Sequence, residues 1–241
     1  MSALPQEQEG LRDLLQQPQS IRHAGRDIWQ GEWHGQRVVL ALSGIGKVAA
    51  ATTATALIER FGVTRLVFTG VAGGLGPGVQ VGDVVVAHDF VQHDMDASPL
   101  FPRYEVPQYG QTRFAADPFL TACLSQAAQL ALASPAAGLF AQARVHHGLI
   151  ASGDCFVASA PQALALSSAL AAAGHAALAV EMEGAAVAQV CRDYGLPFAA
   201  ARTISDRADD SAPGDFLHFM EHTARHYAQI MMPELLNLLS K

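Results

Sequence analysis

Positive charge, aromatic residues and cysteine are all scarce in this chain. Its 241 residues carry 15 Lys and Arg against 22 Asp and Glu, and the formal charge of −7 without a basic stripe argues against a nucleic-acid partner. No apolar run approaches the roughly 20 residues that a membrane span needs, so we expect no membrane partner. The three cysteines are widely spaced and form no CxxC, and no secretory signal is visible, which together favour a reduced, cytoplasmic protein.

Small apolar residues dominate instead. The chain is 50% hydrophobic but only 7% aromatic, a composition that suits helices packed tightly on a sheet. A chain of this length can bury one substantial core, and no repeat, linker or second composition divides it. We therefore expect a single domain over residues 1–241.

Short apolar runs alternate with helical patterns along the chain. Strands are expected at residues 28–33 and 38–42, which form a hairpin around His34-Gly35, and at 65–69, 84–91, 145–151, 177–180 and 198–204. Helices are expected at residues 7–17, 47–61, 117–132 and 161–172, after residue 184, and from about 216 onward. This alternation predicts an α/β fold with helices on both faces of a layered sheet.

The segment V-E-M-E-G at residues 180–184 places two carboxylates, Glu181 and Glu183, around Met182. It lies where an apolar run ends and a helical pattern begins, which indicates a buried strand followed by a helix. Buried charges are costly unless they are paired or used. Because ligands commonly bind at the carboxyl ends of strands in α/β sheets, we expect these carboxylates to face a ligand.

A glycine-rich loop, T-G-V-A-G-G-L-G at residues 69–76, follows another expected strand. It matches neither a Walker A loop nor G-x-G-x-x-G, and a second strand rather than a helix is expected after it. Glycines let the backbone approach a ligand closely, but a purely structural turn explains the same residues. The Val71 side chain cannot hydrogen-bond an anion, which disfavours a phosphate site.

Two further strand ends carry polar residues. The segment S-G-D-C-F-V at residues 152–157 is either a turn with a core Phe or a binding loop. Cys155 has no identifiable base, which favours an inert thiol over a nucleophile. The segment R-T-I-S-D at residues 202–206 is either a surface ion pair or an acid-bearing site. Asp206 could act as a general acid near neutral pH only if burial raises its pKa.

Histidines supply the strongest alternative signal. The segment H-F-M-E-H at residues 218–222 matches the HxxEH pattern of zinc peptidases, and His226 adds a further i+4 step. No other zinc-peptidase motif accompanies it, and a packed or solvated histidine face explains the same spacing. The segment H-D-M-D at residues 93–96 could ligate a metal or be an ordinary polar loop. We expect no metal or organic cofactor.

Six motifs in order carry a family resemblance: A-L-P-Q-E at 3–7, S-G-I-G-K-V at 43–48, T-G-V-A-G-G at 69–74, S-G-D-C-F at 152–156, E-M-E at 181–183 and R-T-I-S-D at 202–206. Together they resemble the 5′-methylthioadenosine/S-adenosylhomocysteine nucleosidases of the nucleoside phosphorylase superfamily. This resemblance implies a three-layer α/β/α fold with a mixed, twisted central sheet. It also implies hydrolysis of the N-glycosidic bond of a 5′-substituted adenosine without metal or organic cofactor.

The resemblance assigns the chemistry to four residues. Asp206 would protonate the purine at N7, and Glu7 would take a proton from the attacking water. Glu183 would hold the ribose hydroxyls, while Arg202 would help to fix the water and the acids. The other implied substrate contacts are Phe156 stacked on the base, the Val157 main chain at the base edge, Met182 on the ribose face, Ile45 in the 5′ pocket, and also Glu181, Val71, Ala72, Gly73 and Ser205.

The N-terminal segment departs from the family pattern, because family members normally carry an apolar strand before the first motif. We therefore expect the sheet to lack its first strand and Glu7 to be loosely held. A phosphorolytic enzyme of the same superfamily remains an alternative to hydrolysis. The choice among methylthioadenosine, S-adenosylhomocysteine, 5′-deoxyadenosine and aminofutalosine-type substrates stays open.

The segment at residues 93–110 is too long for a tight turn and is rich in proline and aromatic residues. The resemblance implies that it crosses a two-fold interface and closes the partner's 5′ pocket, with Phe101 and Pro107 as the contacts. Because closed two-fold dimers are the commonest homo-oligomers, we expect a homodimer.

Overall fold

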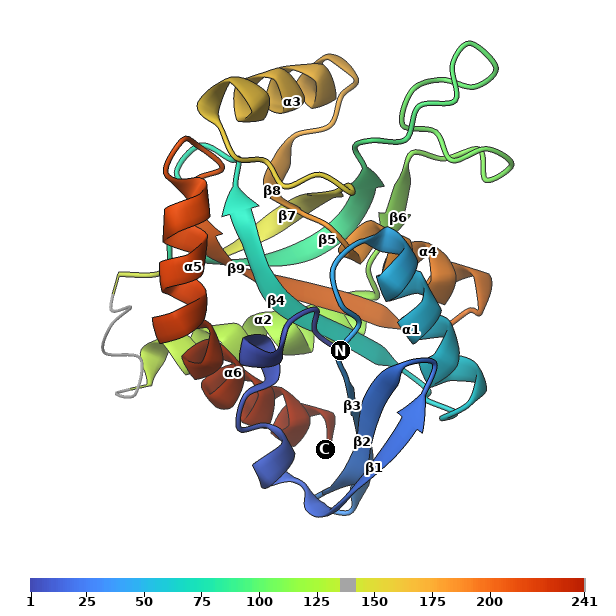
Figure 1. Ribbon diagram of the computed structural model, residues 1–241, viewed down its shortest axis with the longest axis vertical. Helices are drawn as coiled ribbons and strands as arrows, with labels where there is room; N and C mark the ends of the chain where they lie inside the picture. Colours follow the sequence, from blue (N-terminus) through green and yellow to red (C-terminus); the bar gives the residue numbers. More distant parts are fainter. Residues whose placement is uncertain (135–141, 241) are drawn as a thin grey trace.

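The computed structural model describes residues 1–134 and 142–240, and a mixed six-stranded sheet forms its centre (Figure 1). The strands of this sheet are β4 (Leu66–Gly74), β5 (Val84–Gln92), β6 (Arg113–Ala115), β7 (Val145–Ser152), β8 (Ala177–Glu181) and β9 (Phe198–Asp206). Their order is β6-β5-β7-β8-β4-β9, and β5 pairs with β9 as well. The sheet therefore curls until five of its strands form a closed circuit, and the expected α/β fold with a mixed central sheet is confirmed.

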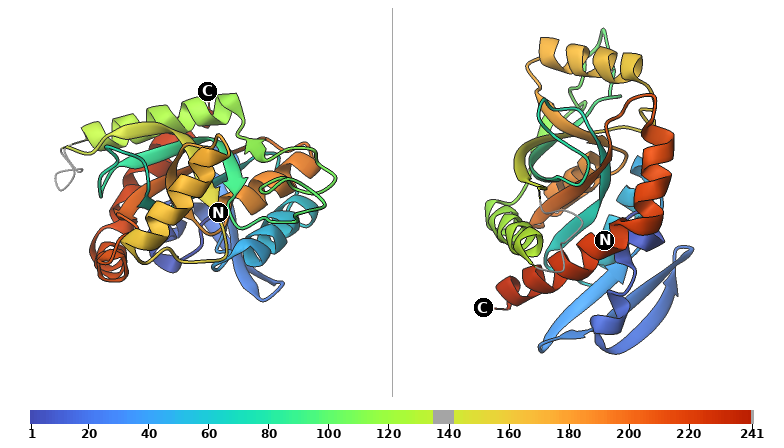
Figure 2. Two further views of the ribbon diagram at one scale, coloured as in Figure 1. Left: turned by 90° about the horizontal axis from the view of Figure 1, so that it is seen from above. Right: turned by 90° about the vertical axis from the view of Figure 1, so that its left-hand side faces the viewer.

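Helices cover the sheet from several sides (Figure 2). They are α1 (Lys47–Glu59), α2 (Pro118–Ala133), α3 (Ala160–Ala172), α4 (Gly184–Asp193), α5 (Ala212–His222) and α6 (Ala224–Leu239). Helices α1 and α4 share one apolar cluster with Phe68 and Phe90, whereas α2, α5 and α6 share a second one with Val84 and Val86. Both clusters exclude water from the strands, so polar groups at the strand ends are desolvated as well.

A second, three-stranded antiparallel sheet extends from the main sheet (blue in Figure 1). Its strands are β1 (Gln16–His23), β2 (Arg26–Trp33) and β3 (Gln36–Ala41). The expected hairpin is confirmed, since Trp33 pairs with Gln36 around a two-residue turn. His34 and Gly35 both have positive φ, at 47° and 78°, as such a tight turn requires.

Two expected helices are wrong. Residues 7–17 do not form a helix: two short 3₁₀ turns, η1 (Pro5–Gln8) and η2 (Arg12–Leu14), are separated by Gly10 at a φ of 82°, and Gln16 already begins β1. Pro18 is tolerated in β1 because this strand pairs only with β2 and is an edge. The long C-terminal helix is broken at Thr223, where the chain turns so that α6 packs against α2.

Candidate active site

Backbone register brings the separate sequence motifs together. In the parallel pair β4–β9, Gly70 lies opposite Arg202, and further along Gly73 lies opposite Asp206. A Cβ at residue 70 would lie 2.5 Å from Arg202 Nη1 and 2.8 Å from Oε1 of Glu7. Residues 69–74, which were expected to form a loop, are the second half of β4. Glycine at residue 70 therefore allows the close approach of buried charged side chains to the β4 backbone.

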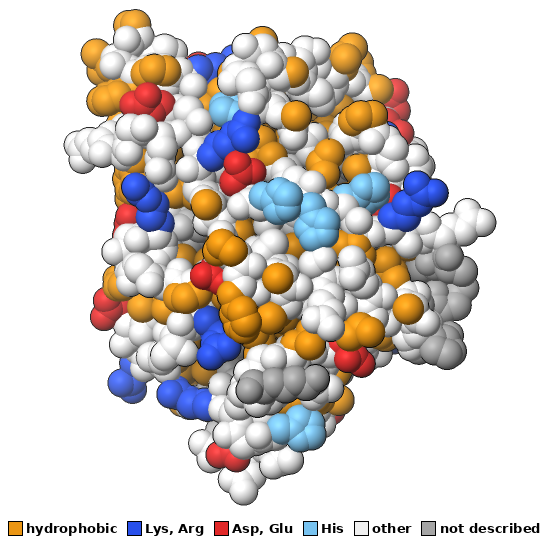
Figure 3. Space-filling view, turned by 180° about the vertical axis from the view of Figure 1, so that it is seen from behind, with side chains coloured by type: hydrophobic (Ala, Val, Ile, Leu, Met, Phe, Trp, Pro, Cys, Tyr) orange, Lys and Arg blue, Asp and Glu red, His pale blue; other side chains and the backbone are white. Residues whose placement is uncertain are grey.

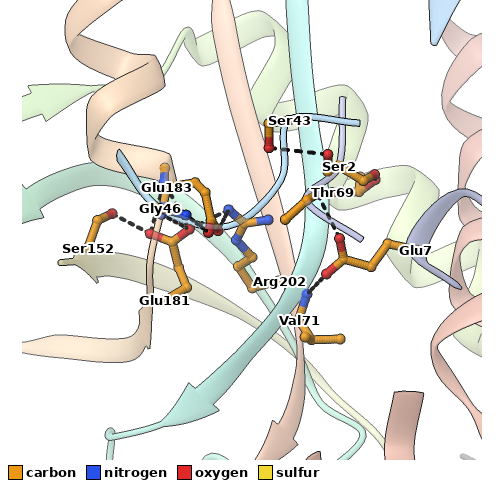
Figure 4. A network of polar contacts seen from close by, with 12 residues as sticks. Ser2, Glu7, Ser43, Gly46, Thr69, Val71, Ser152, Glu181, Glu183 and Arg202 are labelled. Carbon is orange, nitrogen blue, oxygen red and sulfur yellow. Dashed lines mark hydrogen bonds and ion pairs between the residues drawn. The ribbon is translucent and has the colours of Figure 1, made fainter. Parts of the chain in front are cut away.

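Glu181 and Arg202 form the buried centre of the site (Figure 4). Arg202 is 1% exposed, its Nη2 donates to Oε2 of Glu181, and its guanidinium carbon lies 4.1 Å from the centre of the Phe68 ring. Glu181 also accepts hydrogen bonds from the Ser152 hydroxyl and from the backbone N–H groups of Glu183 and Gly184. Protein donors therefore already engage both oxygens of Glu181.

Glu183 lies beside this centre but has fewer protein partners. Its Oε1 accepts from the N–H of Gly46 at 2.9 Å, and its Oε2 lies 3.7 Å from Nη2 of Arg202. Burial, with a smaller contribution from the charge of Glu181, raises the pKa of Glu183 to about 7, although Arg202 and the Gly46 N–H oppose the shift. This carboxyl group therefore titrates near neutral pH.

Glu7 is buried against β4, so the looseness expected for it is not seen. Its Oε2 accepts from the N–H groups of Ala3 and Leu4, both at 2.8 Å, and its Oε1 accepts from the N–H of Val71 at 3.0 Å. The preceding segment is also tied down, because Thr69 N–H donates to the carbonyl of Met1. Burial raises the pKa of Glu7, while Arg202 and these N–H donors act against the rise.

Asp206 ends β9 and is 2% exposed. Its Oδ2 accepts from the Ser205 hydroxyl and its Oδ1 from the N–H of Ala208, both at 2.8 Å. Burial raises the pKa of Asp206, and the charges of Asp215 and Asp209 add to the rise, although both hydrogen bonds favour the ionised form. Desolvation thus prevails over hydrogen bonding, which is the condition set above for a general acid.

The residues expected to contact the substrate differ in exposure, and Ile45 and Phe156 form an exposed rim. Phe156 is 41% exposed and meets Phe216 edge-on at 5.6 Å, whereas Val157 is buried with Val180. Ile45 is 55% exposed. The expected substrate contacts that are half-buried are Met182, Val71, Phe101 and Pro107, and those that are buried are Ala72, Gly73 and Ser205.

Comparison with known proteins assigns this arrangement to a family. A model of the Phosphorylase superfamily matches residues 1–236. The 5′-methylthioadenosine/S-adenosylhomocysteine nucleosidase of Chromohalobacter salexigens is 36% identical over 235 residues, which cover 96% of this chain and 93% of that protein. The chain belongs to the methylthioadenosine/S-adenosylhomocysteine nucleosidases.

Solved structures of the family share the fold closely. The nucleosidase from Neisseria meningitidis in complex with methylthio-immucillin-A has a TM-score of 0.86 and 36% identity, with 98% of this chain and 96% of that chain covered. A nucleosidase from Colwellia psychrerythraea in complex with adenine has a TM-score of 0.87 and 31% identity, covering 99% and 93%. The futalosine hydrolase of Helicobacter pylori reaches a TM-score of 0.84 at 32% identity, covering 98% and 95%.

The histidine motif is split by the break between α5 and α6. His218 and His222 lie in α5 with their rings 4.5 Å apart, and His222 Nδ1 contacts the carbonyl oxygen of His218. His226 follows the break at Thr223 and therefore does not continue the i+4 row. Within residues 1–134 and 142–240, no three His, Cys, Asp or Glu side chains are grouped as a metal site, and none of the helices there could cross a membrane.

Sequence reasoning missed two functional contacts of this nucleosidase site. Ser152 was assigned no role, yet its hydroxyl donates to Glu181 and accepts from the N–H of Ala185. The N–H of Gly46 was equally unforeseen as a partner of Glu183. Both residues lie inside recognised motifs, so motif membership was the available signal, but only the fold shows which carboxylate each one meets.

Proposed function

We propose that the protein hydrolyses the N-glycosidic bond of 5′-methylthioadenosine and S-adenosylhomocysteine, releasing adenine and the 5-thio-substituted ribose. The observation that carries the proposal is the set of three buried carboxylic acids, Glu7, Glu183 and Asp206, whose pKa values are all raised. Raised carboxyl pKa values in one site are the mark of acid–base chemistry. The same activity is named for relatives that are 35% and 36% identical over 93% and 96% of this chain.

Breaking the bond develops negative charge on the departing purine, and Asp206 neutralises it. A neutral carboxylic acid donates its proton to N7 as the bond lengthens, so adenine leaves as a neutral base. The raised pKa of Asp206 keeps that proton available closer to neutral pH. Ser205 and the Ala208 N–H orient the carboxyl group and accommodate the carboxylate that remains.

Positive charge develops on the ribose at the same time, and Glu183 stabilises it. A carboxylate that holds the 2′- and 3′-hydroxyls strengthens its interaction as the sugar becomes cationic. Glu181 has its oxygens occupied by Ser152, Arg202 and backbone N–H groups. Its role is therefore to hold Arg202 and the start of α4, and the hydroxyls fall to Glu183.

Glu7 activates the attacking water. The N–H of Val71, in β4, already donates to Glu7 at 3.0 Å. A phosphate ion needs several free donors, and a carboxylate at this point repels it. This contact favours hydrolysis over the phosphorolytic alternative.

The 5′ group sets the substrate class. Exposed apolar residues, among them Ile45 and Phe156, suit an alkylthio substituent and a purine ring. S-adenosylhomocysteine, 5′-deoxyadenosine and aminofutalosine-type nucleosides share the adenine and ribose contacts. Because the chain is similar to a futalosine hydrolase, the aminofutalosine-type nucleosides are included among the substrates to be tested.

Assembly and setting complete the proposal. We infer a homodimer, because Val48 on α1 and Leu100 in the 93–110 segment leave large apolar side chains in solvent, and a second copy would cover them. Tyr104 is buried within its own chain and cannot contribute to the dimer contact.

The corresponding metabolic role is the salvage of methionine from the 5-thio-ribose product in the cytoplasm.

The deciding experiment is a product assay. The purified protein is given each of the four nucleosides with and without phosphate, and free adenine and the sugar product are quantified. We expect adenine and a free 5-substituted ribose at a rate independent of phosphate. Formation of ribose 1-phosphate would transfer the protein to the phosphorylases, and absence of adenine from all four nucleosides would refute the proposal.

A further inference from the structure

A closed ring of hydrogen bonds ties three loops together beside the site. The N–H of Lys47, the first residue of α1, donates to Oδ1 of Asp154, which follows β7, at 2.7 Å. The N–H of Asp154 donates to Oδ2 of Asp94, which follows β5, at 2.9 Å. The ammonium of Lys47 closes the ring on Oδ1 of Asp94 at 2.6 Å. Each of the three residues is thus bound to the other two.

The ring is closely fitted. Gly46 has a φ of 99°, and a Cβ at this residue would lie 3.1 Å from Oδ1 of Asp154, so the approach of the two loops depends on glycine. The side chains of Lys47 and Asp94 are only 17% and 32% exposed. Burial alone would raise the pKa of Asp94, but the donors on Lys47 and Asp154 lower it below its usual value. Asp94 is therefore ionised at neutral pH.

The ring lies between groups that would contact opposite ends of a nucleoside. Ile45 precedes Lys47 by two residues, and Phe156 follows Asp154 by two. Gly46, inside the same turn, donates its N–H to Glu183 (Figure 4). Partly exposed ion pairs add little to the stability of a fold, so the consequence of this ring is the placement of loops.

We propose that Lys47, Asp94 and Asp154 are positioning residues. They fix the spacing between the segment that carries Ile45 (residues 43–48, the 5′-group loop) and the segment that carries Phe156 (residues 152–157, the base loop), and they hold the Gly46 N–H on Glu183. This inference rests on the proposed function for its substrate. A nucleoside with a 5′-thio substituent contacts both loops at once and depends on their spacing. Free adenine contacts only the base loop and does not.

The test uses Asp94→Ala, with Asp89→Ala as the matched control. Asp89 lies on β5, the strand that Asp94 follows, and pairs with Arg113 at 3.2 Å, with side chains 23% and 35% exposed, but its pair does not join these loops. Asp94→Ala is expected to lower kcat/KM for methylthioadenosine about 10- to 100-fold, the order that small misplacement of reacting groups produces. The Kd for adenine should stay within about threefold, and the control should stay near wild type in both.

A second readout needs no activity. Hydrogen exchange of peptides covering residues 43–48 and 152–157 should accelerate in Asp94→Ala and not in Asp89→Ala. The Asp154 amide loses its acceptor, and the loop whose Asp154 carboxylate accepts from the Lys47 amide is then held less firmly. Asp94→Asn, which keeps an acceptor for Asp154 but not the charge, should give intermediate values and replaces Asp94→Ala if that variant does not fold.

Three results would overturn the inference: unchanged kcat/KM in Asp94→Ala, equal losses for adenine and methylthioadenosine, or unchanged exchange in both peptides. A wild-type protein that releases no adenine would refute the proposed function alone, since the exchange measurement still decides whether the ring holds the loops.

Discussion

The buried centre and the exposed rim of the site differ in how many contacts the protein itself supplies to their side chains. At the centre, Glu181 and Arg202 are buried and joined to each other, and Glu181 has further donors around it. At the rim, Ile45 and Phe156 are 55% and 41% exposed, although Phe156 meets the edge of Phe216. The molecule therefore has its electrostatics in place before any ligand arrives, while its apolar contacts await one.

This difference follows from what each kind of interaction needs. Electrostatic stabilisation of a transition state works when charges are already oriented in a site that excludes water. Apolar contact is non-directional and forms when surfaces meet, so its walls can come from the substrate or from a second copy. The face behind the view of Figure 1 carries several histidine side chains (Figure 3). The rings of His88 and His147 stack with their centres 5.5 Å apart.

The largest effect is expected from Asp206, the buried acid at the end of β9. Asp206→Asn keeps the shape and a hydrogen bond but cannot donate a carboxylic proton. We expect kcat to fall about 10²- to 10⁴-fold, the usual contribution of general acid catalysis, with the fold retained. Steady-state kinetics and circular dichroism measure the two properties. Activity within about threefold of wild type would remove Asp206 from the role of acid.

Substitutions of the two glutamates of the E-M-E motif should affect different properties, stability for Glu181 and turnover for Glu183. Glu181→Ala leaves the buried Arg202 without its partner, and breaking such a pair costs about 3–5 kcal/mol in the free energy of unfolding. Glu183→Gln should instead fold normally and lose most of its turnover. Denaturant titration and adenine release test both statements. Equal, mild effects from the two variants would show that the motif has been misassigned.

The centre was largely predictable from sequence, and the contacts within it were not. Charged residues at the ends of apolar runs identified Glu181, Arg202 and Asp206, because period and polarity are local properties. The partners Ser152, at the end of β7, and Gly46, at the start of α1, lie 29 and 137 residues in sequence from the carboxylates they meet. No local pattern indicates such pairing, which only the order and register of the strands decide.

The errors in secondary structure have the same origin. Leu11, Leu14 and Leu15 have helical spacing, but Leu11 and Leu15 flank the 3₁₀ turn η2 and pack with Leu40 of β3 and Ala228 of α6. Helix α5 ends at His222 although the sequence pattern continues, because the chain must turn there for α6 to cover α2. In both places tertiary packing overrides a valid local preference.

The raised pKa of Glu183 should make the stability of the folded protein depend on pH. The pKa of Glu183 is raised to about 7, so the folded protein holds a proton that the unfolded chain releases near pH 4.5. The stability from this group is complete below pH 4.5 and is lost as the pH rises through 7. Glu183→Gln lacks this titration, so wild type should lose up to about 3 kcal/mol relative to the variant over that window, at roughly 1.4 kcal/mol per pKa unit. Parallel stability curves would contradict the shift.

The smallest effect is expected at the rim, from a residue that the partner copy would contribute. Phe101→Ala should weaken binding of methylthioadenosine about tenfold, because part of an aromatic side chain worth about 1.5–3 kcal/mol on full burial is lost. Binding of adenine should not change, since adenine does not reach the 5′ pocket. Phe156→Ala is the control and should weaken both ligands, because base stacking is worth about 1–3 kcal/mol. Calorimetry measures the affinities. Light scattering tests the oligomeric state, and a fully active monomer at assay concentration would exclude the shared pocket, whatever the effects of the two substitutions.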